Sequence, residues 1–180
     1  MQAILCLRKE MAREQEGTLD RDVCEEALKR LPGEKGAAWL GFLRAHAALT
    51  KALDADLIAN FGVPLSAFHV LFGVAQSDEG YLRMSDVADQ ARLSPSRASR
   101  LVTELERRGL LERRSCESDT RVVYAAITDV GRALAAKLEQ LHFEGIERRF
   151  FSALRPEQVA QLAELWPRVL AATAETPASA

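Results

Sequence analysis

Apolar residues recur at spacings of three and four along nearly the whole chain from Glu34 onward, and this pattern is interrupted once. Such spacing places apolar side chains on one face of an α-helix. The interruption consists of two short strand-like segments, 110–114 and 122–127, joined by a polar stretch, which is typical of a β-hairpin. The predicted fold is therefore mainly α with one small hairpin. We expect helices over 37–61, 66–76, a short stretch from residue 85, 95–108, a long stretch from 128 or 129, and a last stretch after 156.

One of these helices has clear signals at both ends. Ser94 offers a side-chain oxygen as N-cap, Pro95 occupies the first helical position, and Gly109 suits the left-handed residue that follows a helix. Ser66 and Ser85 are predicted to cap the two preceding helices in the same way.

The two helices that follow the hairpin also carry apolar stripes. Thr128 or Asp129 is expected to cap the first of them. Its predicted stripe consists of Val130, Leu134, Leu138, Leu141 and Ile146. Pro167 lies inside the last helix and is expected to kink or shorten it, because proline lacks the N–H of a helical hydrogen bond.

Composition and cysteine usage limit the class of protein. Hydrophobic residues make up 48% and charged residues 28% of the chain, as in soluble globular proteins. No run approaches the 18 or more apolar residues of a membrane span, and the first residues are charged too soon for a signal peptide. The cysteines lie far apart without a CxxC pair, which favours a reducing cytoplasm over a disulfide framework. They are Cys6, Cys24 and Cys116.

Charge is distributed unevenly along the sequence. The 180 residues carry a formal net charge of −2, whereas residues 92–121 contain eight Arg, no Lys and five acidic residues, a net charge of +3. A local basic segment on an acidic chain suits a protein that presents one face to phosphate groups. The alternative is the solvated charged face of an ordinary helix.

The helix after Ser94 separates apolar from polar side chains. Its core-facing side is predicted to consist of Ala98, Leu101, Val102 and Leu105. The opposite side carries Ser96, Arg97, Arg100, Thr103 and Arg107. A polar and basic face of this kind can read the major groove of DNA, where Arg pairs bidentately with guanine. The alternative is that these arginines only keep an amphipathic helix soluble.

The hairpin after this helix is basic as well. Arg113 and Arg114 end its first strand, and Asp119 and Arg121 lie in the loop. A carboxylate two residues from an Arg can orient the guanidinium for entry into a narrow minor groove, although a surface ion pair without a role is the alternative. Two helices joined by a tight turn, followed by a basic hairpin, predict a winged helix-turn-helix over 62–128.

The same segment resembles the MarR family of regulators. The matching stretches are Leu-Ser-Pro-Ser-Arg-Ala-Ser-Arg-Leu-Val at 93–102, Leu-Glu-Arg-Arg-Gly-Leu-Leu-Glu-Arg at 105–113, and, in the wing, Asp119-Thr120-Arg121, Ala125, Ile127-Thr128 and Gly131-Arg132. The resemblance covers about residues 36–171. It implies a homodimer with intertwined first and last helices, two winged domains beneath them, and a small-molecule pocket between these layers. The long N-terminal extension and Pro167 depart from the family pattern.

The resemblance also implies site residues and a domain organisation. Ser96, Arg97, Ser99 and Arg100 become recognition-helix contacts, and Arg121, positioned by Asp119, becomes the wing arginine. The full predicted DNA-binding set is Ser94, Ser96, Arg97, Ser99, Arg100, Thr103, Arg113, Arg114, Asp119 and Arg121. The predicted parts are an N-terminal extension over 1–33 with one possible helix, a helical dimerisation region over 34–61 and 129–173, the winged domain over 62–128, and a flexible tail over 174–180.

Other residues could respond to small molecules, oxidants or metals. A pocket for an aromatic or carboxylate effector could use Trp39, Phe42, His46, Phe68, Phe72 and Arg100, although core packing is the stronger interpretation of the aromatic residues. Cys116 in the wing leaves a thiol switch as a further hypothesis. The histidines fall on three separate helices at no ligand spacing, so we expect no metal and no cofactor. They are His46, His69 and His142.

The sequence contains no enzyme signature such as a phosphate-binding glycine loop or a nucleophile elbow. We therefore expect a dimeric, ligand-responsive transcriptional regulator that binds double-stranded operator DNA. We expect it to act as a repressor. The alternative from another class is a winged-helix adaptor that binds proteins and not DNA. An adaptor would favour an acidic or apolar recognition helix, whereas this helix is basic.

Overall fold

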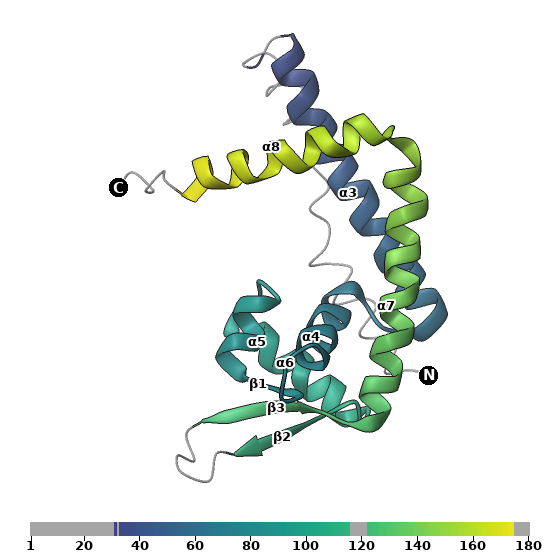
Figure 1. Ribbon diagram of the computed structural model, residues 1–180. Helices are drawn as coiled ribbons and strands as arrows, with labels where there is room; N and C mark the ends of the chain where they lie inside the picture. The colour runs from purple at the N-terminus through teal and green to yellow at the C-terminus, as the bar shows by residue number, and fades with distance from the viewer. Residues whose placement is uncertain (1–30, 32, 116–121, 175–180) are drawn as a thin grey trace. The chain divides into compact units, whose positions relative to one another are not determined.

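The computed structural model describes residue 31 and residues 33–115 and 122–174 (Figure 1). The elements in chain order are α3 (Glu34–Phe61), α4 (Leu65–Ala75), β1 (Tyr81–Arg83), α5 (Met84–Gln90), α6 (Pro95–Arg107), β2 (Leu111–Ser115), β3 (Val123–Ile127), α7 (Asp129–Arg149), the 3₁₀ helix η1 (Phe151–Ala153) and α8 (Pro156–Ala174). The predicted mainly helical class is confirmed. The chain forms two compact units, residues 1–51 and 52–180, and α3 runs across their boundary.

The described part of the first unit consists mainly of the N-terminal half of α3. Aromatic rings follow one another along this helix at spacings of three and four residues. The ring centroids of Trp39 and Phe42 lie 5.9 Å apart, and those of Phe42 and His46 lie 6.3 Å apart. Three members of the predicted effector pocket therefore share one face of α3.

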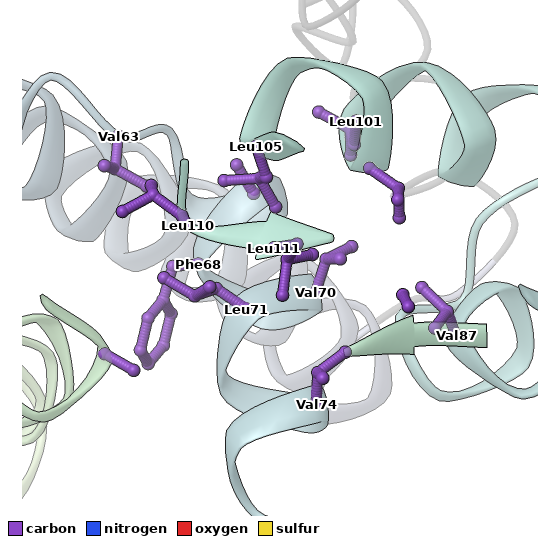
Figure 2. Close-up of a cluster of buried hydrophobic side chains, with 14 of the residues drawn as sticks. Val63, Phe68, Val70, Leu71, Val74, Val87, Leu101, Leu105, Leu110 and Leu111 are labelled. Carbon is purple, nitrogen blue, oxygen red and sulfur yellow. The ribbon is translucent and has the colours of Figure 1, made fainter. Parts of the chain in front are cut away.

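The core of the second unit is built around α4 (Figure 2). Phe68, Leu71 and Val74 of α4 are buried, and they belong to one cluster with Leu105 of α6 and Leu138 of α7. A helix that is apolar nearly all round is expected to be buried, and this expectation is confirmed for α4. Each fully buried Leu or Phe stabilises the fold by about 1.5–3 kcal/mol. The tight packing fixes α6 on one side of α4 and α7 on another.

The sheet contains one strand more than the hairpin that the sequence predicts. Its order is β1-β3-β2, and both pairings are antiparallel. In the register, Leu82 of β1 and Arg113 of β2 both lie opposite Ala125 of β3. β1 spans only three residues, too few to show an alternating pattern. Strands β2 and β3 extend past β1 as an arm beside α6 (Figure 1).

The predicted ends of α6 are confirmed. Ser94 Oγ accepts a hydrogen bond from the backbone N–H of Arg97 at 3.4 Å, and Pro95 is the first helical residue. Gly109 has a φ of +71°, the left-handed conformation that glycine adopts without strain. Sequence signals therefore place the start of this helix at the correct residue and its end within one residue, since the helix ends at Arg107 and not at 108.

The predicted N-caps of α4 and α5 are wrong. Helix α4 begins at Leu65, whose N–H donates to Asp54 Oδ1 at 2.7 Å, so a side chain from α3 satisfies the start of α4 and Ser66 lies inside the helix. Helix α5 begins at Met84, so Ser85 is its second residue. Local capping rules fail at α4 because the capping group comes from 11 residues away.

Thr128 joins the start of α7 to the end of α6. Its hydroxyl accepts from the N–H of Gly131 at 3.0 Å, as predicted for the N-cap, and donates to the carbonyl of Gly109 at 2.7 Å. Gly131 packs directly on the chain that follows α6, because a Cβ at this position would overlap the carbonyl of Leu110. The first turn of α7 is therefore held tightly against the end of α6.

The predicted stripe of α7 is correct in part, because Leu138 is buried and Leu134 and Leu141 pack partly buried against the core. Gly131, Ala135, Leu138 and Gly145 are buried, and these positions define the face that meets the core. Val130 is 66% exposed, so its place in the predicted stripe is wrong. It lies one position, about 100° around the helix, from Gly131 and thus beside the buried face.

Helix α8 continues through Pro167 to Ala174, so of the two expected effects of this proline, a kink or a shorter helix, the shortening is wrong. Several large apolar residues of α8 remain exposed. Within the described part of the chain, no single helix is long and apolar enough to cross a membrane. Only α3 and α4 counted together reach that length and composition, and they are bent by 78° at their junction.

Candidate nucleic-acid interface

The face of α6 opposite the core is polar and basic, as predicted. Ala98, Val102 and Leu105 are at most 1% exposed and point into the core. The side chains of Arg97 and Arg100 lie on the other face. Among the described residues, no acidic group or carbonyl pairs with either guanidinium. Two cations on the N-terminal turns of α6 are therefore available to an external anion or base edge.

Ser94 and Ser96 stand at the start of the same helix. Ser94 caps α6, and its Oγ lies 3.3 Å from Ser96 Oγ. The N-terminus of a helix favours anions because its first N–H groups lack helical partners. This end of α6 thus combines hydroxyl groups, helix N–H groups and the two arginines on one surface.

Two further arginines near the end of α6 are engaged within the protein. Arg107 forms two hydrogen bonds with Glu104, at 2.7 and 3.0 Å, and these bonds raise the pKa of Arg107. Arg108 donates to the carbonyls of Gly62 and Phe61 at 3.3 and 3.4 Å. Arg107 is therefore paired within α6, whereas Arg108 joins the end of α6 to the end of α3.

The side chain of Arg113 turns from β2 back onto α6. Its Nη1 donates to Glu106 Oε2 at 2.6 Å, and its Nη2 donates to the carbonyl of Ser99 and to Thr103 Oγ1, each at 3.0 Å. The backbone N–H of Arg113 donates to the other oxygen of Glu106 at 3.1 Å. Three predicted DNA contacts, Arg113, Ser99 and Thr103, are thus brought together by one network.

Glu106 is the member of this network that the sequence analysis missed. Ser99, Thr103 and Glu106 follow one another at spacings of four and three, so a helical wheel places them on one face. The pairing of that face with β2 depends on how the strand crosses the helix, which no local pattern encodes.

Arg114, the neighbouring arginine of β2, is arranged differently. Its Nε donates to Glu112 Oε1 at 2.7 Å, so the pair forms within one strand and remains exposed. Asp119 and Arg121, the predicted wing pair, lie outside the described residues. The same is true of Cys6, Cys24 and Cys116, so the thiol hypothesis stays a prediction.

The predicted effector residues of the second unit lie in different settings. Phe68 is 2% exposed and belongs to the core, as the alternative interpretation held. Phe72 contacts Phe68 at a centroid distance of 5.4 Å and also lines a cleft of about 560 Å³. The cleft lies between α4 and the end of α5, and its lining includes His69, Phe72, Gln76, Gln90 and Arg92. Arg100 is not part of the lining.

Two histidines meet beside this cleft. His69 of α4 and His142 of α7 pack edge to face with ring centroids 6.1 Å apart. Desolvation by burial lowers the pKa of both imidazoles, and the proximity of His69 lowers the pKa of His142 further. Nowhere in the described ranges do three or more His, Cys, Asp or Glu side chains gather as a metal site requires.

Comparisons with known proteins agree with this geometry. The model of the MarR family matches residues 61–122. AbsC, a MarR family transcriptional regulator from Streptomyces coelicolor, is 30% identical with a TM-score of 0.72, over 81% of this chain and 98% of AbsC. Sco3205, a MarR family regulator from the same organism solved in complex with DNA, is 30% identical with a TM-score of 0.73, over 83% of this chain and 93% of Sco3205.

A third solved structure shares the fold at lower identity. MepR from S. aureus, solved as a DNA complex, is 22% identical with a TM-score of 0.65, over 75% of this chain and 96% of MepR. A comparison with curated proteins finds no match.

Proposed function

Because the chain belongs to the MarR family of transcriptional regulators, we propose that it is a cytoplasmic, homodimeric repressor that binds operator DNA sequence-specifically and is released by a small effector. It acts as a regulator and not as an enzyme. The observation that carries the proposal is the pair Arg97 and Arg100 on the solvent face of α6, with no partner among the described residues. The solved DNA complexes of Sco3205 and MepR support it.

In this proposal α6 enters the major groove with its N-terminal turns. Arg100 pairs with a base edge, and Arg97, Ser94 and Ser96 serve bases or phosphates near the helix start. The β2–β3 arm approaches the backbone and the adjacent minor groove, where arginines are favoured. Glu104 and Glu106 do not repel the DNA strongly, because each is paired with an arginine of the protein.

The proposal is tested by selecting duplexes from a random-sequence library with the purified full chain. We expect one enriched sequence with two related half-sites, bound at least about 10³-fold more tightly than a scrambled duplex at the same salt concentration. Failure to enrich any sequence would contradict DNA reading and favour the protein adaptor.

The homodimer is supported by apolar surface on α8. Leu165, Val169 and Leu170 are 47%, 50% and 63% exposed, and they lie on one side of the helix. Exposed apolar stripes of this length are costly in water and usually mark an association surface. A two-fold dimer would present two copies of α6 to half-sites about 34–36 Å apart.

Effector binding is supported by the cleft between α4 and α5. It combines an aromatic side chain, Phe72, with polar or cationic groups such as Gln76 and Arg92, which suits a small aromatic carboxylate. Because α4 also carries the core of the winged domain, a ligand there could alter how α6 is presented. Thermal-shift measurements with aromatic carboxylates, followed by operator titration with and without each hit, test this part. A hit that leaves operator affinity unchanged would contradict it.

A further inference from the structure

Arg113 of β2 forms several hydrogen bonds with α6, through both its side chain and its backbone N–H. Its guanidinium reaches three α6 residues, Ser99, Thr103 and Glu106, which span almost two turns of one helix face. Both carboxylate oxygens of Glu106 accept hydrogen bonds from Arg113, one from its side chain and one from its backbone. A charge-assisted, two-point contact of this kind restrains orientation as well as distance.

We propose that Arg113 is a positioning residue that fixes the β2–β3 arm against α6, with Glu106 as its anchor, and that it does not contact DNA. This inference rests on the proposed function, because the arm and α6 must meet the duplex together. It also assigns Arg113, which the sequence analysis placed among the DNA contacts, to a role within the protein.

The neighbouring arginines provide the contrast. Arg97, which is partly exposed, and Arg100, which is exposed, have no partner in the described part of the chain. Arg114 pairs with Glu112 of its own strand, so that ion pair cannot connect two elements. Among the arginines of the described part of β2, Arg113 alone pairs with an acidic residue of α6, and its side chain is 27% exposed, against 58% for Arg114.

A phosphate that replaced Glu106 as the partner of the Arg113 guanidinium would leave a carboxylate behind. Glu106 would then remain unpaired next to the phosphate, and two negative charges would repel each other. The pair within the protein is half-shielded from water, which makes breaking it more costly than breaking an exposed pair. The network is therefore expected to persist when DNA binds.

The two roles predict opposite effects for Glu106→Gln. This change keeps the side-chain shape, removes one negative charge and weakens the anchor. If Arg113 positions the arm, operator affinity falls about tenfold, as for the loss of a coupled pair, whereas affinity for random duplex stays constant or rises slightly. If Arg113 binds phosphate, releasing it from Glu106 strengthens binding to both duplexes.

The experiment measures dissociation constants for the selected operator and for a random duplex over a range of salt concentrations. The variants are Glu106→Gln, Arg113→Gln and the double variant, and Glu112→Gln is the matched control that removes one charge from the same surface. We expect Arg113→Gln to lower the operator-to-random affinity ratio without reducing the salt slope, and the double variant to lose no more than the worse single variant.

Glu112→Gln is expected to leave the operator-to-random ratio unchanged. Thermal unfolding of each variant shows whether it is folded, and simple loss of folded protein lowers both affinities equally, leaving their ratio intact. Tighter operator binding by Glu106→Gln, a salt slope reduced by about one in Arg113→Gln, or an unchanged ratio in both variants would overturn the inference. A wild-type chain that selects no operator would instead contradict the proposed function itself.

Discussion

Two arginines of the same helix face show how a neighbouring side chain decides the role of a charge. Arg100 is without a partner among the described residues, whereas Arg107 donates two hydrogen bonds to the carboxylate of Glu104. Both lie on the polar side of α6 and look equivalent in the sequence. An unpaired guanidinium retains all its donors for a base edge, whereas a paired one has already committed two of them.

Arg100→Ala is therefore expected to weaken operator binding by about 1–3 kcal/mol and largely to spare binding to random duplex. Arg107→Ala, which removes the same charge from the same helix, is the control and is expected to change both affinities slightly and equally. Fluorescence anisotropy titrations with both duplexes measure the difference. Equal losses on the two duplexes for Arg100→Ala would make this residue a phosphate contact.

The histidine pair predicts how stability depends on pH. The pKa values of His69 and His142 are lowered by burial, so the folded state favours neutral imidazoles more than the unfolded state does, whose ordinary value is 6.5. A lowered pKa gives stability that is fully present above pH 6.5 and is lost as pH falls below it. His142 Nδ1 is buried without a hydrogen-bond partner among the described groups, which adds to the cost of protonation.

We expect the free energy of unfolding to fall between pH 7 and pH 5.5, and to fall less in a His142→Phe variant. Urea denaturation at closely spaced pH values measures both curves. The difference between the curves isolates the histidine, since carboxylates contribute equally to each. Parallel curves over this range would show that His142 binds protons equally well in the folded and unfolded states.

At the scale of single elements, α6 could be predicted from the sequence, whereas the starts of α4 and α5 could not. The cap of α6 comes from Ser94, which is local. The start of α4 is satisfied by Asp54, a residue of another helix, and β1 is too short to show a period. The same limit applies to the site, where Arg113 could be identified as basic and near the wing but not as the partner of Glu106.

The close contact between the start of α7 and the end of α6 predicts that position 131 has no room for a residue larger than glycine. Gly131→Ala is expected to lower the free energy of unfolding by about 1–3 kcal/mol, because the added methyl group overlaps the backbone of Leu110 and neither helix can shift freely. Gly41→Ala is the control, since a Cβ there meets no atom within 4 Å and the helix gains about 0.5–1 kcal/mol. Chemical denaturation of both variants measures the two changes, and equal effects would show that Gly131 has room.

At the scale of the whole molecule, the exposed apolar stripe of α8 is the surface through which we expect two copies of the chain to form a dimer. Leu170→Glu places a charge in the proposed dimer surface and is expected to shift the protein to monomer at micromolar concentration. Ala171→Glu, on the side of the same helix opposite the centre of the stripe, is the control and should remain dimeric. Sedimentation velocity distinguishes the species. A wild-type monomer, or a Leu170→Glu variant that stays dimeric, would contradict this surface.

The hydroxyl of Thr128 bonds to α7 through Gly131 and to the end of α6 through Gly109, so a rotation of α7 cannot leave α6 in place. Two ligands that both shift the equilibrium between arrangements of α6 and α7 change each other's affinity by the same factor. If an effector in the cleft between α4 and α5, where His69 packs against His142 of α7, lowers operator affinity by some factor, operator DNA lowers effector affinity by that same factor. Reversing operator occupancy from 99:1 to 1:99 requires a differential affinity of about 10⁴. The protein on its operator therefore senses the effector less readily than the protein free in solution.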